Sequence, residues 1–307
     1  MAFCLGGLYY DMPISEPERK FINNCYICGS SMKSTFQKGS YRFWSCPKCC
    51  LECIAPQPDD SVLQQIYGKH YYKAWGLSSN ESLVRKIKQQ TFSMYLSWLA
   101  KPHPGDRLLD CGAATGYLVE LADQQGWEAY AIELSEFGAN ACSNILGADH
   151  VHQGNVYDAK FNANPDNLFE VIIMIDFIEH LRDPRDLLRW AREHLSKGGH
   201  LLLVTPQVGS HSHHLMGTLW THYKIEHLWY FNKNNLSAFL REMGFTVVLA
   251  RDAPKNLSLQ YIFHQFKIYP HPIITPVFNI LDQLLPTLAK KVRITIPLGD
   301  MLLIAHV

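Results

Sequence analysis

The chain has 307 residues, 47% of them hydrophobic, and its 28 lysines and arginines balance its 28 aspartates and glutamates. This composition is ordinary for a chain that buries a sizeable core, and the length fits one large domain with a smaller one. Zero net charge disfavours nucleic acid and anionic lipid as partners. No apolar run is long enough for a transmembrane segment, and the N-terminus lacks the basic and apolar regions of a signal peptide.

Residues 1–60 are predicted to form a small N-terminal unit, because they are rich in cysteine, proline and serine. The unit contains two CxxC pairs, Cys25 with Cys28 and Cys46 with Cys49, and 17 residues lie between the pairs. This spacing matches a zinc ribbon, in which each CxxC turn directs two thiolates to one tetrahedral ion. Four protein ligands leave no open position on the zinc, so we expect a structural role.

The register of the second pair is open, because Cys50 and Cys53 form a third CxxC. An odd number of cysteines with this spacing favours metal binding in a reducing compartment over a disulfide framework, so a cytoplasmic location is expected. Cys111 and Cys142 fall within the predicted sheet domain and are most simply core residues.

Residues 61–104 are predicted to be a helical lid or linker. The sequence "SLVRKIKQQTFSMYLSWLA" has a helical pattern, and it stops at "KPHPG", where two prolines end a helix. An aromatic segment, "YGKHYYKAWG" at 67–76, precedes this helix. Its rings can line a cationic ligand or simply pack between domains.

Residues 105–307 are predicted to form an α/β domain, because short apolar runs alternate with helical patterns. This alternation indicates a mostly parallel, Rossmann-like sheet with helices on both faces. The predicted strands are "RLLDC", "EAYAIE", "DHVHQ", "LFEVIIMI", "GHLLLVT", "FTVVLA" and "GDMLLIAHV", the last as an edge strand. The predicted helices are "YLVELADQQG", "EFGANACSNIL", "PRDLLRWAREHLS" and "NNLSAFLREMG", and "HSHHL" at 211–215 is expected to be a solvated loop.

An apolar, proline-interrupted insertion at about 254–297 separates the last two predicted strands. It fits a helical lid, the face of a homodimer, plain packing, or the wall of a pocket for an apolar acceptor. Membrane-surface association is weakly supported, because the helical piece carries few basic residues.

The stretch "LLDCGAATGY" raises the main functional question, because a tight turn follows directly on a strand. A dinucleotide fingerprint requires glycines at 112, 114 and 117, and the chain has Ala114 and Tyr117 at the last two. What remains is Asp110-x-Gly112-x-x-x-Gly116, with Glu133 at the end of the next strand. A carboxylate there can accept bonds from a ribose diol, although a plain strand–helix turn also fits the glycines.

These segments resemble the class I S-adenosylmethionine-dependent methyltransferases over roughly residues 106–250. "LLDCGAATGYL", "AIELS", "FEVIIMIDFIEHLRDP" and "LSKGGHLLLVTP" are similar to the motifs of that family, and Ala114 departs from its usual middle glycine. Within the class the chain looks most like the branch that includes ubiquinone-biosynthesis and sugar methyltransferases. "CPKCCLECIAPQP" resembles the cysteine knuckle of the family and favours the pair at 46 and 49.

The resemblance implies an S-adenosylmethionine site at the carboxyl edge of the sheet. Glu133 would hold the ribose hydroxyls, Leu134 would pack on the adenine, and Asp176 would face the methionine end. The remaining implied contacts are Tyr71 or Tyr72 as part of a lid, Asp110, Gly112, Ala113, Ala114 and Gly116 around the methionine and ribose, and Asn155 and Val156 near the adenine.

Two groups compete for the role of catalytic base. His227, in "YKIEHLWYF", corresponds to a segment that faces the acceptor in similar enzymes, although a structural histidine also fits. The second group is Asp176-x-x-Glu179-His180. The resemblance implies either a positioning role for Glu179 and His180 or a Mg²⁺ or Zn²⁺ site.

The sequence therefore predicts methyl transfer from S-adenosylmethionine to a small molecule, most simply to an oxygen of a sugar, phenol or other secondary metabolite. One alternative is a zinc-ribbon RNA methyltransferase, which the aromatic and basic residues around "YRFWSC" favour and the zero net charge opposes. The other alternative is a non-catalytic S-adenosylmethionine-binding protein.

Overall fold

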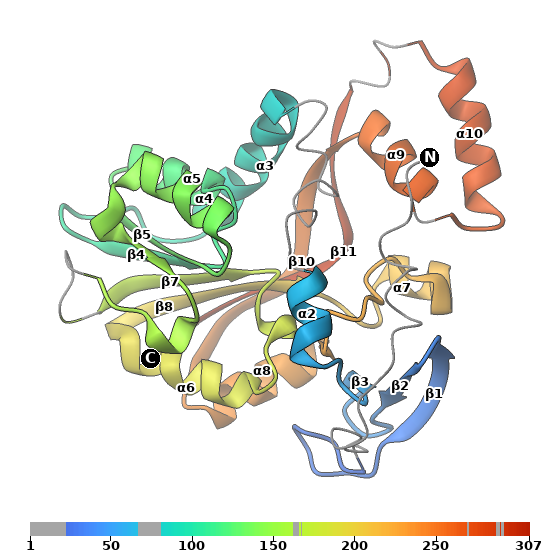
Figure 1. Ribbon diagram of the computed structural model, residues 1–307, viewed down its shortest axis with the longest axis horizontal. Coiled ribbons are helices and arrows are strands. Elements are labelled where there is room, and N and C mark those ends of the chain that lie inside the picture. The colour runs from blue at the N-terminus through green and yellow to red at the C-terminus, as the bar shows by residue number, and fades with distance from the viewer. Residues whose placement is uncertain are drawn as a thin grey trace.

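The computed structural model describes residues 23–66, 81–161, 166, 168–268, 270–286, 289 and 292–307. Its larger sheet has seven strands in the order β10-β11-β8-β7-β4-β5-β6 (Figure 1). Strands β4 to β8 pair in parallel, and β11 is antiparallel to both neighbours. The predicted mostly parallel sheet is confirmed. The strands are β4 Arg107–Cys111, β5 Glu128–Glu133, β6 Val151–Gln153, β7 Phe169–Ile175, β8 Leu195–Pro206, β10 Thr246–Ser258 and β11 Arg293–His306.

Helices cover both faces of this sheet, as predicted. Helices α3, α4 and α5 lie on one face and α6 and α8 on the other (Figure 1). Because parallel strands end at the same edge, the loops after β4, β5, β7 and β8 meet there. The helices are α3 Glu81–Leu96, α4 Tyr117–Gln124, α5 Glu136–Leu146, α6 Pro184–His194 and α8 Lys233–Glu242.

The prediction that the last strand lies at the edge is wrong. β11 lies between β8 and β10, and β10 is the edge strand. The reason is hydrophobicity on both faces: residues 299–305 of β11 are all buried, whereas buried and exposed residues are mixed along β10. The run "MLLIA" in β11 has the continuous apolar pattern that an interior strand requires.

A second, four-stranded sheet has the order β1-β2-β3-β9. Its first three strands come from the cysteine-rich N-terminal region, and the fourth comes from the loop between β8 and α8. Buried side chains of this sheet share one hydrophobic cluster with those of the large sheet. The bounds are β1 Lys33–Lys38, β2 Tyr41–Ser45, β3 Glu52–Ala55 and β9 Trp229–Tyr230, and helix α2 follows at Asp60–Ile66.

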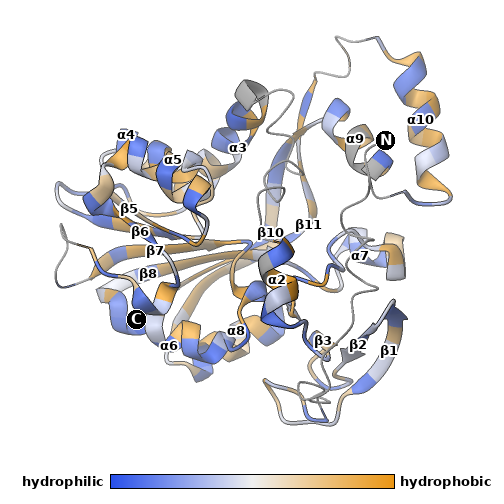
Figure 2. Cartoon of the chain, in the orientation of Figure 1, coloured by the Kyte–Doolittle hydropathy of each residue, from blue (hydrophilic) through white to orange (hydrophobic). Residues whose placement is uncertain are grey.

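The insertion at 254–297 continues β10 and β11 beyond the sheet as a two-stranded extension, on which α9 (Leu259–Ile268) and α10 (Ile274–Leu284) are carried. Phe278 of α10 packs against two phenylalanine rings of α9. The hydropathy colouring shows apolar residues along α10, and Val277, Ile280 and Leu284 are exposed (Figure 2). No helix in the described part of the chain is long and apolar enough to cross a membrane.

Candidate functional site

The glycine-rich turn after β4 has the backbone conformation that its sequence indicates. Gly112, Ala114 and Gly116 all have positive φ angles, of 82°, 50° and 79°. A Cβ on Gly112 would lie 2.8 Å from the ring of Phe177, so only glycine fits there. Ala114 takes the left-handed conformation without a glycine, which costs on the order of 1 kcal/mol. The departure from the family motif is therefore accommodated by a strained backbone rather than by a different turn.

Glu133 ties the end of β5 to this turn. One carboxylate oxygen accepts the N–H of Ala114 at 2.8 Å, and the other accepts the N–H of Ser135 at 2.9 Å. A carboxylate oxygen can accept more than one hydrogen bond, so these two bonds are compatible with hydroxyl donors on the same carboxylate. The turn packs closely on α5, because a Cβ on Gly138 would lie 2.6 Å from the carbonyl oxygen of Ala114. The sequence analysis did not identify Gly138. A glycine in the first turn of a helix can indicate such a close approach of two backbones.

An acidic and a basic side chain interact under the same turn. Burial and the charge of Glu133 together raise the pKa of Asp110 to about 7, against the opposing effect of Lys88 of α3. Burial also lowers the pKa of Lys88 to about 8, against the attraction of Asp176 and Asp110. Sequence reasoning missed Lys88, because its position in an amphipathic helix gives no signal of a charge directed into the site.

The three residues predicted to contact adenine, Leu134, Asn155 and Val156, differ in exposure. Leu134, directly after β5, is 61% exposed, which leaves its side chain available to a ligand. Asn155 accepts the N–H of Tyr157 with its side-chain oxygen and so begins a short 3-10 helix, while Val156 is buried. Its contact with adenine stays a prediction. Tyr71 and Tyr72 lie outside the described residues.

Asp176 follows β7 at the same edge and has a positive φ of 50°. Its Oδ1 is buried without a hydrogen-bond partner in the described structure. Strained backbone and an unpaired buried oxygen cost free energy and are typical of functional sites. Its charge also affects the pKa values of Lys88, Lys255 and His222.

Glu179, His180 and His227 form a cluster beside Asp176. Each offers one ligand atom, and these atoms lie within 4.8 Å of one another. The rings of His180 and His227 meet edge to face at 4.7 Å. Sequence reasoning grouped Glu179 and His180 with Asp176, whereas the structure groups them with His227. The sequence could not show this, because 46 residues lie between His180 and His227.

Glu179 and His180 are each held by a partner outside the cluster. Thr205 donates its hydroxyl to Oε2 of Glu179 at 2.9 Å, and Nδ1–H of His180 donates to the carbonyl of Glu226 at 2.9 Å. Oε1 of Glu179 and Nδ1 of His227 are buried and have no partner among the residues that the structure describes. Oε1 of Glu179 and Nδ1 of His227 are therefore available to bind a ligand or each other.

Burial determines the charge of these groups. It lowers the pKa of His227 well below 6.5, and the neighbouring His180 adds to the effect. It lowers the pKa of His180 to about 4 and that of His222 to about 3. Burial raises the pKa of Glu179 well above its ordinary value, and the charge of Asp176 raises it further. At neutral pH the histidines are neutral, so an imidazole is available as a base.

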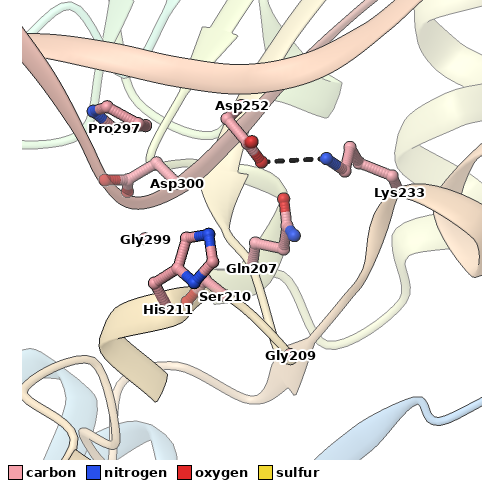
Figure 3. Close-up of a pocket in the computed structure, with 9 residues that line it drawn as sticks. All are labelled: Gln207, Gly209, Ser210, His211, Lys233, Asp252, Pro297, Gly299 and Asp300. Carbon is pink, nitrogen blue, oxygen red and sulfur yellow. Dashed lines mark hydrogen bonds and ion pairs between the residues drawn. The ribbon is translucent and has the colours of Figure 1, made fainter. Parts of the chain in front are cut away.

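A cavity of about 220 Å³ lies at the end of β8 (Figure 3). Lys233 and Asp252 form an ion pair of 2.9 Å at its wall. Asp300 is buried there and pairs with Lys255 at 2.9 Å, and sequence reasoning identified neither residue. The lining residues are Gln207, Gly209, Ser210, His211, Lys233, Asp252, Pro297, Gly299 and Asp300.

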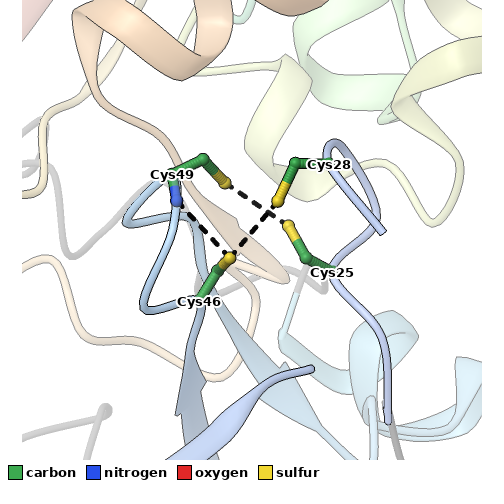
Figure 4. Close-up of side chains that lie close together, drawn as sticks. All are labelled: Cys25, Cys28, Cys46 and Cys49. Atoms are coloured by element: carbon green, nitrogen blue, oxygen red, sulfur yellow. Dashed lines mark hydrogen bonds between the residues drawn. The ribbon is translucent and has the colours of Figure 1, made fainter. Parts of the chain in front are cut away.

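Four thiols converge from the two CxxC turns of the N-terminal region (Figure 4). The sulfurs of Cys25 and Cys49 are 3.4 Å apart, as are those of Cys28 and Cys46, so neither pair is a disulfide. A tetrahedral zinc with Zn–S bonds of ~2.3 Å requires sulfurs about 3.8 Å apart, which these positions nearly meet. Burial raises the pKa of Cys28, but hydrogen bonds from Ser30 and the neighbouring thiols outweigh it and lower the pKa to about 6.

The structure also settles the register of the second pair. Cys50 is exposed, Cys53 is buried in β3, and neither belongs to the cluster. Cys111 and Cys142 are buried in the core, as predicted. The predicted loop at 211–215 is instead helix α7, His211–Met216, and His213 bonds to Tyr223. That prediction was wrong because Ser210 caps a short helix.

The comparison with known sequences gives one family and one curated relative. The Methyltransferase domain family matches residues 83–250. Phosphoethanolamine N-methyltransferase 1 of Zea mays is 25% identical over 143 residues, which are 46% of this chain. The match spans only 26% of that relative, so it does not carry the acceptor over to this chain.

Solved structures share the fold. An S-adenosylmethionine-dependent methyltransferase from Archaeoglobus fulgidus is 19% identical, with a TM-score of 0.51 and coverage of 77% of this chain and 100% of that one. The [4+2]-cyclase SpnF is 14% identical, with a TM-score of 0.51 and coverage of 81% and 97%. Such identities show the fold alone. The family match covers more than half of the chain, which therefore belongs to the Methyltransferase domain family.

Proposed function

We propose that this chain transfers a methyl group from S-adenosylmethionine to an oxygen of a small molecule, such as a sugar, a phenol or another secondary metabolite. The observation that carries the proposal is the single edge of the sheet on which Glu133, Asp176 and His227 are gathered. The first two fit the ribose and the methionine end of the cofactor. His227, neutral and buried, fits the base that removes the acceptor proton.

The chemistry requires mainly positioning, because the cofactor's methyl group is already activated on a sulfonium. The acceptor oxygen must be aligned with that methyl, lose its proton and be shielded from water. The buried cluster of Glu179, His180 and His227 supplies a dry wall with a proton acceptor. Glu179 and His180 are proposed to orient His227 and the acceptor.

A panel of acceptors tests this function. Purified enzyme and methyl-labelled S-adenosylmethionine are incubated with sugars, phenols and other hydroxyl compounds, with amines as a comparison. Amines are included because the maize relative is named for a nitrogen acceptor. We expect label in a hydroxyl compound and stoichiometric S-adenosylhomocysteine. Transfer only to amines would contradict the oxygen assignment.

A metal at Glu179, His180 and His227 is the second candidate for this site, because two histidines and a carboxylate lie within ligand distance of one another. Thr205 and the carbonyl of Glu226 bond to Glu179 and His180, and hydrogen bonds of this kind orient metal ligands. A divalent ion there would polarise the acceptor oxygen, and His227 would then be a ligand rather than the base. Dialysis against a chelator distinguishes the two when the four-cysteine cluster keeps its zinc, because only the metal mechanism then loses activity that added Mg²⁺ restores.

The RNA-methyltransferase alternative has less support. The chain has no net charge, and aromatic residues of the small sheet such as Phe43 are buried rather than displayed for stacking. A gel shift with RNA at rising salt tests it. Salt-sensitive binding of RNA would favour this alternative, and S-adenosylmethionine binding without transfer to any acceptor would favour a non-catalytic protein.

We also propose that the four-cysteine cluster binds one structural zinc. Two observations support this proposal. The four sulfurs converge on one point, and the N-terminal region is so small that a bound metal would contribute much of its stability. All four positions of the ion would be filled by thiolates, so no open position is available for catalysis.

Metal analysis of protein purified without added zinc should find about one zinc per chain. Cys28→Ser should lose this zinc and destabilise residues 23–55, whereas the control Cys50→Ser, at an exposed cysteine outside the cluster, should keep it. Full zinc content in Cys28→Ser would contradict the assignment.

A further inference from the structure

The N-terminal sheet is joined directly to the segment that carries His227. Cys53 of β3 pairs with Trp229 of β9, and the N–H of Ile54 donates to the carbonyl of Leu228 at 3.2 Å. On its other side, the N–H of Leu228 donates to the carbonyl of Glu179 at 2.8 Å. The backbone beside His227 is thus bonded to β3 on one side and to the Glu179–His180 segment on the other.

A directed chain of hydrogen bonds makes a second connection. The N–H of Gly209 donates to Nδ1 of His213 at 3.3 Å, which leaves the proton of that ring on Nε2. Nε2–H therefore donates to the oxygen of Tyr223 at 2.8 Å, and the O–H of Tyr223 donates to Glu52 of β3 at 2.6 Å. Gly209 also lines the cavity at the end of β8, so this chain runs from the cavity wall to the N-terminal sheet.

The cysteine cluster makes a third connection. The carbonyl of Cys49 accepts the side-chain N–H groups of Asn232 at 3.0 Å and Asn235 at 3.1 Å. These two asparagines form the capping box that begins α8, immediately after β9. The Cys46–Cys49 turn therefore fixes the C-terminal end of the connection between β8 and α8.

Building on the proposed function, we infer that the four-cysteine module is a positioning element of the methyltransferase site. It holds residues 207–232, with His227 among them, against Glu179 and His180. Glu52 and Tyr223 are positioning residues, because they act through this segment and do not belong to the catalytic cluster. The loops after β4 and β5, which include Glu133, have no part in these three connections, so we expect their contribution to cofactor affinity to be unaffected by the module.

Tyr223→Phe tests this inference, because it removes one hydroxyl and keeps the ring that packs on Phe36 and Phe43. Tyr26→Phe is the matched control. The hydroxyl of Tyr26 also joins the N-terminal region to the large domain through a carboxylate, but that carboxylate is Asp183 at the start of α6, outside residues 207–232. The substitution keeps the Tyr26 ring, which packs on Trp229. The readouts are hydrogen exchange of the amides in 207–232, zinc content and the affinity for S-adenosylhomocysteine.

We expect Tyr223→Phe to speed exchange in 207–232 by roughly tenfold, the scale of one lost hydrogen bond, and Tyr26→Phe to leave it unchanged. Zinc content and S-adenosylhomocysteine affinity should stay at wild-type values in both, and kcat on any acceptor from the panel should fall only in Tyr223→Phe. Equal exchange in the two variants would overturn the inference. Absence of S-adenosylhomocysteine binding in the wild type would instead reject the proposed function and leave the exchange test valid.

A second pair of variants covers the case in which Tyr223→Phe does not fold. Glu52→Ala removes the acceptor of the tyrosine proton, whereas Glu52→Gln keeps an oxygen that accepts it. We expect faster exchange in 207–232 for Glu52→Ala and near wild-type exchange for Glu52→Gln. Similar exchange in both would contradict the role of the Tyr223–Glu52 bond. Loss of zinc in Cys28→Ser should speed exchange in the same residues, and an unchanged rate there would contradict the role of the cysteine turn.

Discussion

Glu133→Ala should weaken the binding of S-adenosylmethionine and S-adenosylhomocysteine by about 2–4 kcal/mol, roughly 30- to 1,000-fold in Kd. Two effects contribute. The variant loses the carboxylate proposed to accept the two ribose hydroxyls, and it also releases the N–H groups of Ala114 and Ser135 that shape the turn. Calorimetric titration of the purified variant measures the change.

Glu136→Ala is the control for this prediction. Glu136 carries the same charge three residues along the chain, in the first turn of α5, and is exposed. Its removal should leave the affinity within a factor of about two, since exposed charges contribute little. Equal affinity for Glu133→Ala and wild type would reject the ribose assignment.

His227→Ala should lower kcat by about 10²-fold or more, the usual scale for loss of a general base. Affinity for S-adenosylhomocysteine should remain close to wild type, because His227 is proposed to face the acceptor and is not among the residues proposed to hold the cofactor. His103→Ala, at an exposed histidine, should retain full activity. Initial rates with an acceptor from the panel and calorimetry on the same samples separate the two effects.

The pH profile gives a second readout of His227. Burial lowers its pKa well below 6.5, so the neutral form that accepts a proton persists as the pH falls below 6.5. The rate should therefore stay level from neutral pH downward and decline only when the pH reaches the lowered pKa. Half-maximal activity at pH 6.5 or above would contradict a buried, neutral base. A rate that a chelator abolishes while the zinc of the four-cysteine cluster is retained would transfer the role to a metal on Glu179, His180 and His227.

The parts of the fold that could be predicted are those that local sequence determines. β4, β5 and α5 have the predicted bounds, because each is an apolar run or periodic segment closed by a glycine, an acid or a cap. The cysteine cluster was also predictable, since two CxxC turns can meet at one ion wherever the connecting chain runs. Ser135, which caps α5 through Gly138, is a further local signal of this kind.

The parts that could not be predicted depend on pairing between distant segments. The place of β11 between β8 and β10 is decided by which strand buries both faces. The joining of β9 to β3 brings together residues nearly 180 positions apart, such as Cys53 and Trp229. The same limit applies to three ionisable residues that the sequence did not single out. Their pKa values are shifted by burial and by the charge of Asp176, and both depend on the folded structure; they are Lys88, His222 and Lys255.

The central claim is that this chain binds S-adenosylmethionine at the carboxyl edge of its large sheet. Calorimetric titration of the wild-type protein with S-adenosylhomocysteine tests it most directly, with NADH as the competing nucleotide. The account predicts one site per chain, no competition by NADH, and loss of most affinity in Glu133→Ala. Absence of binding to the folded, zinc-loaded protein, or binding that NADH displaces, would contradict it.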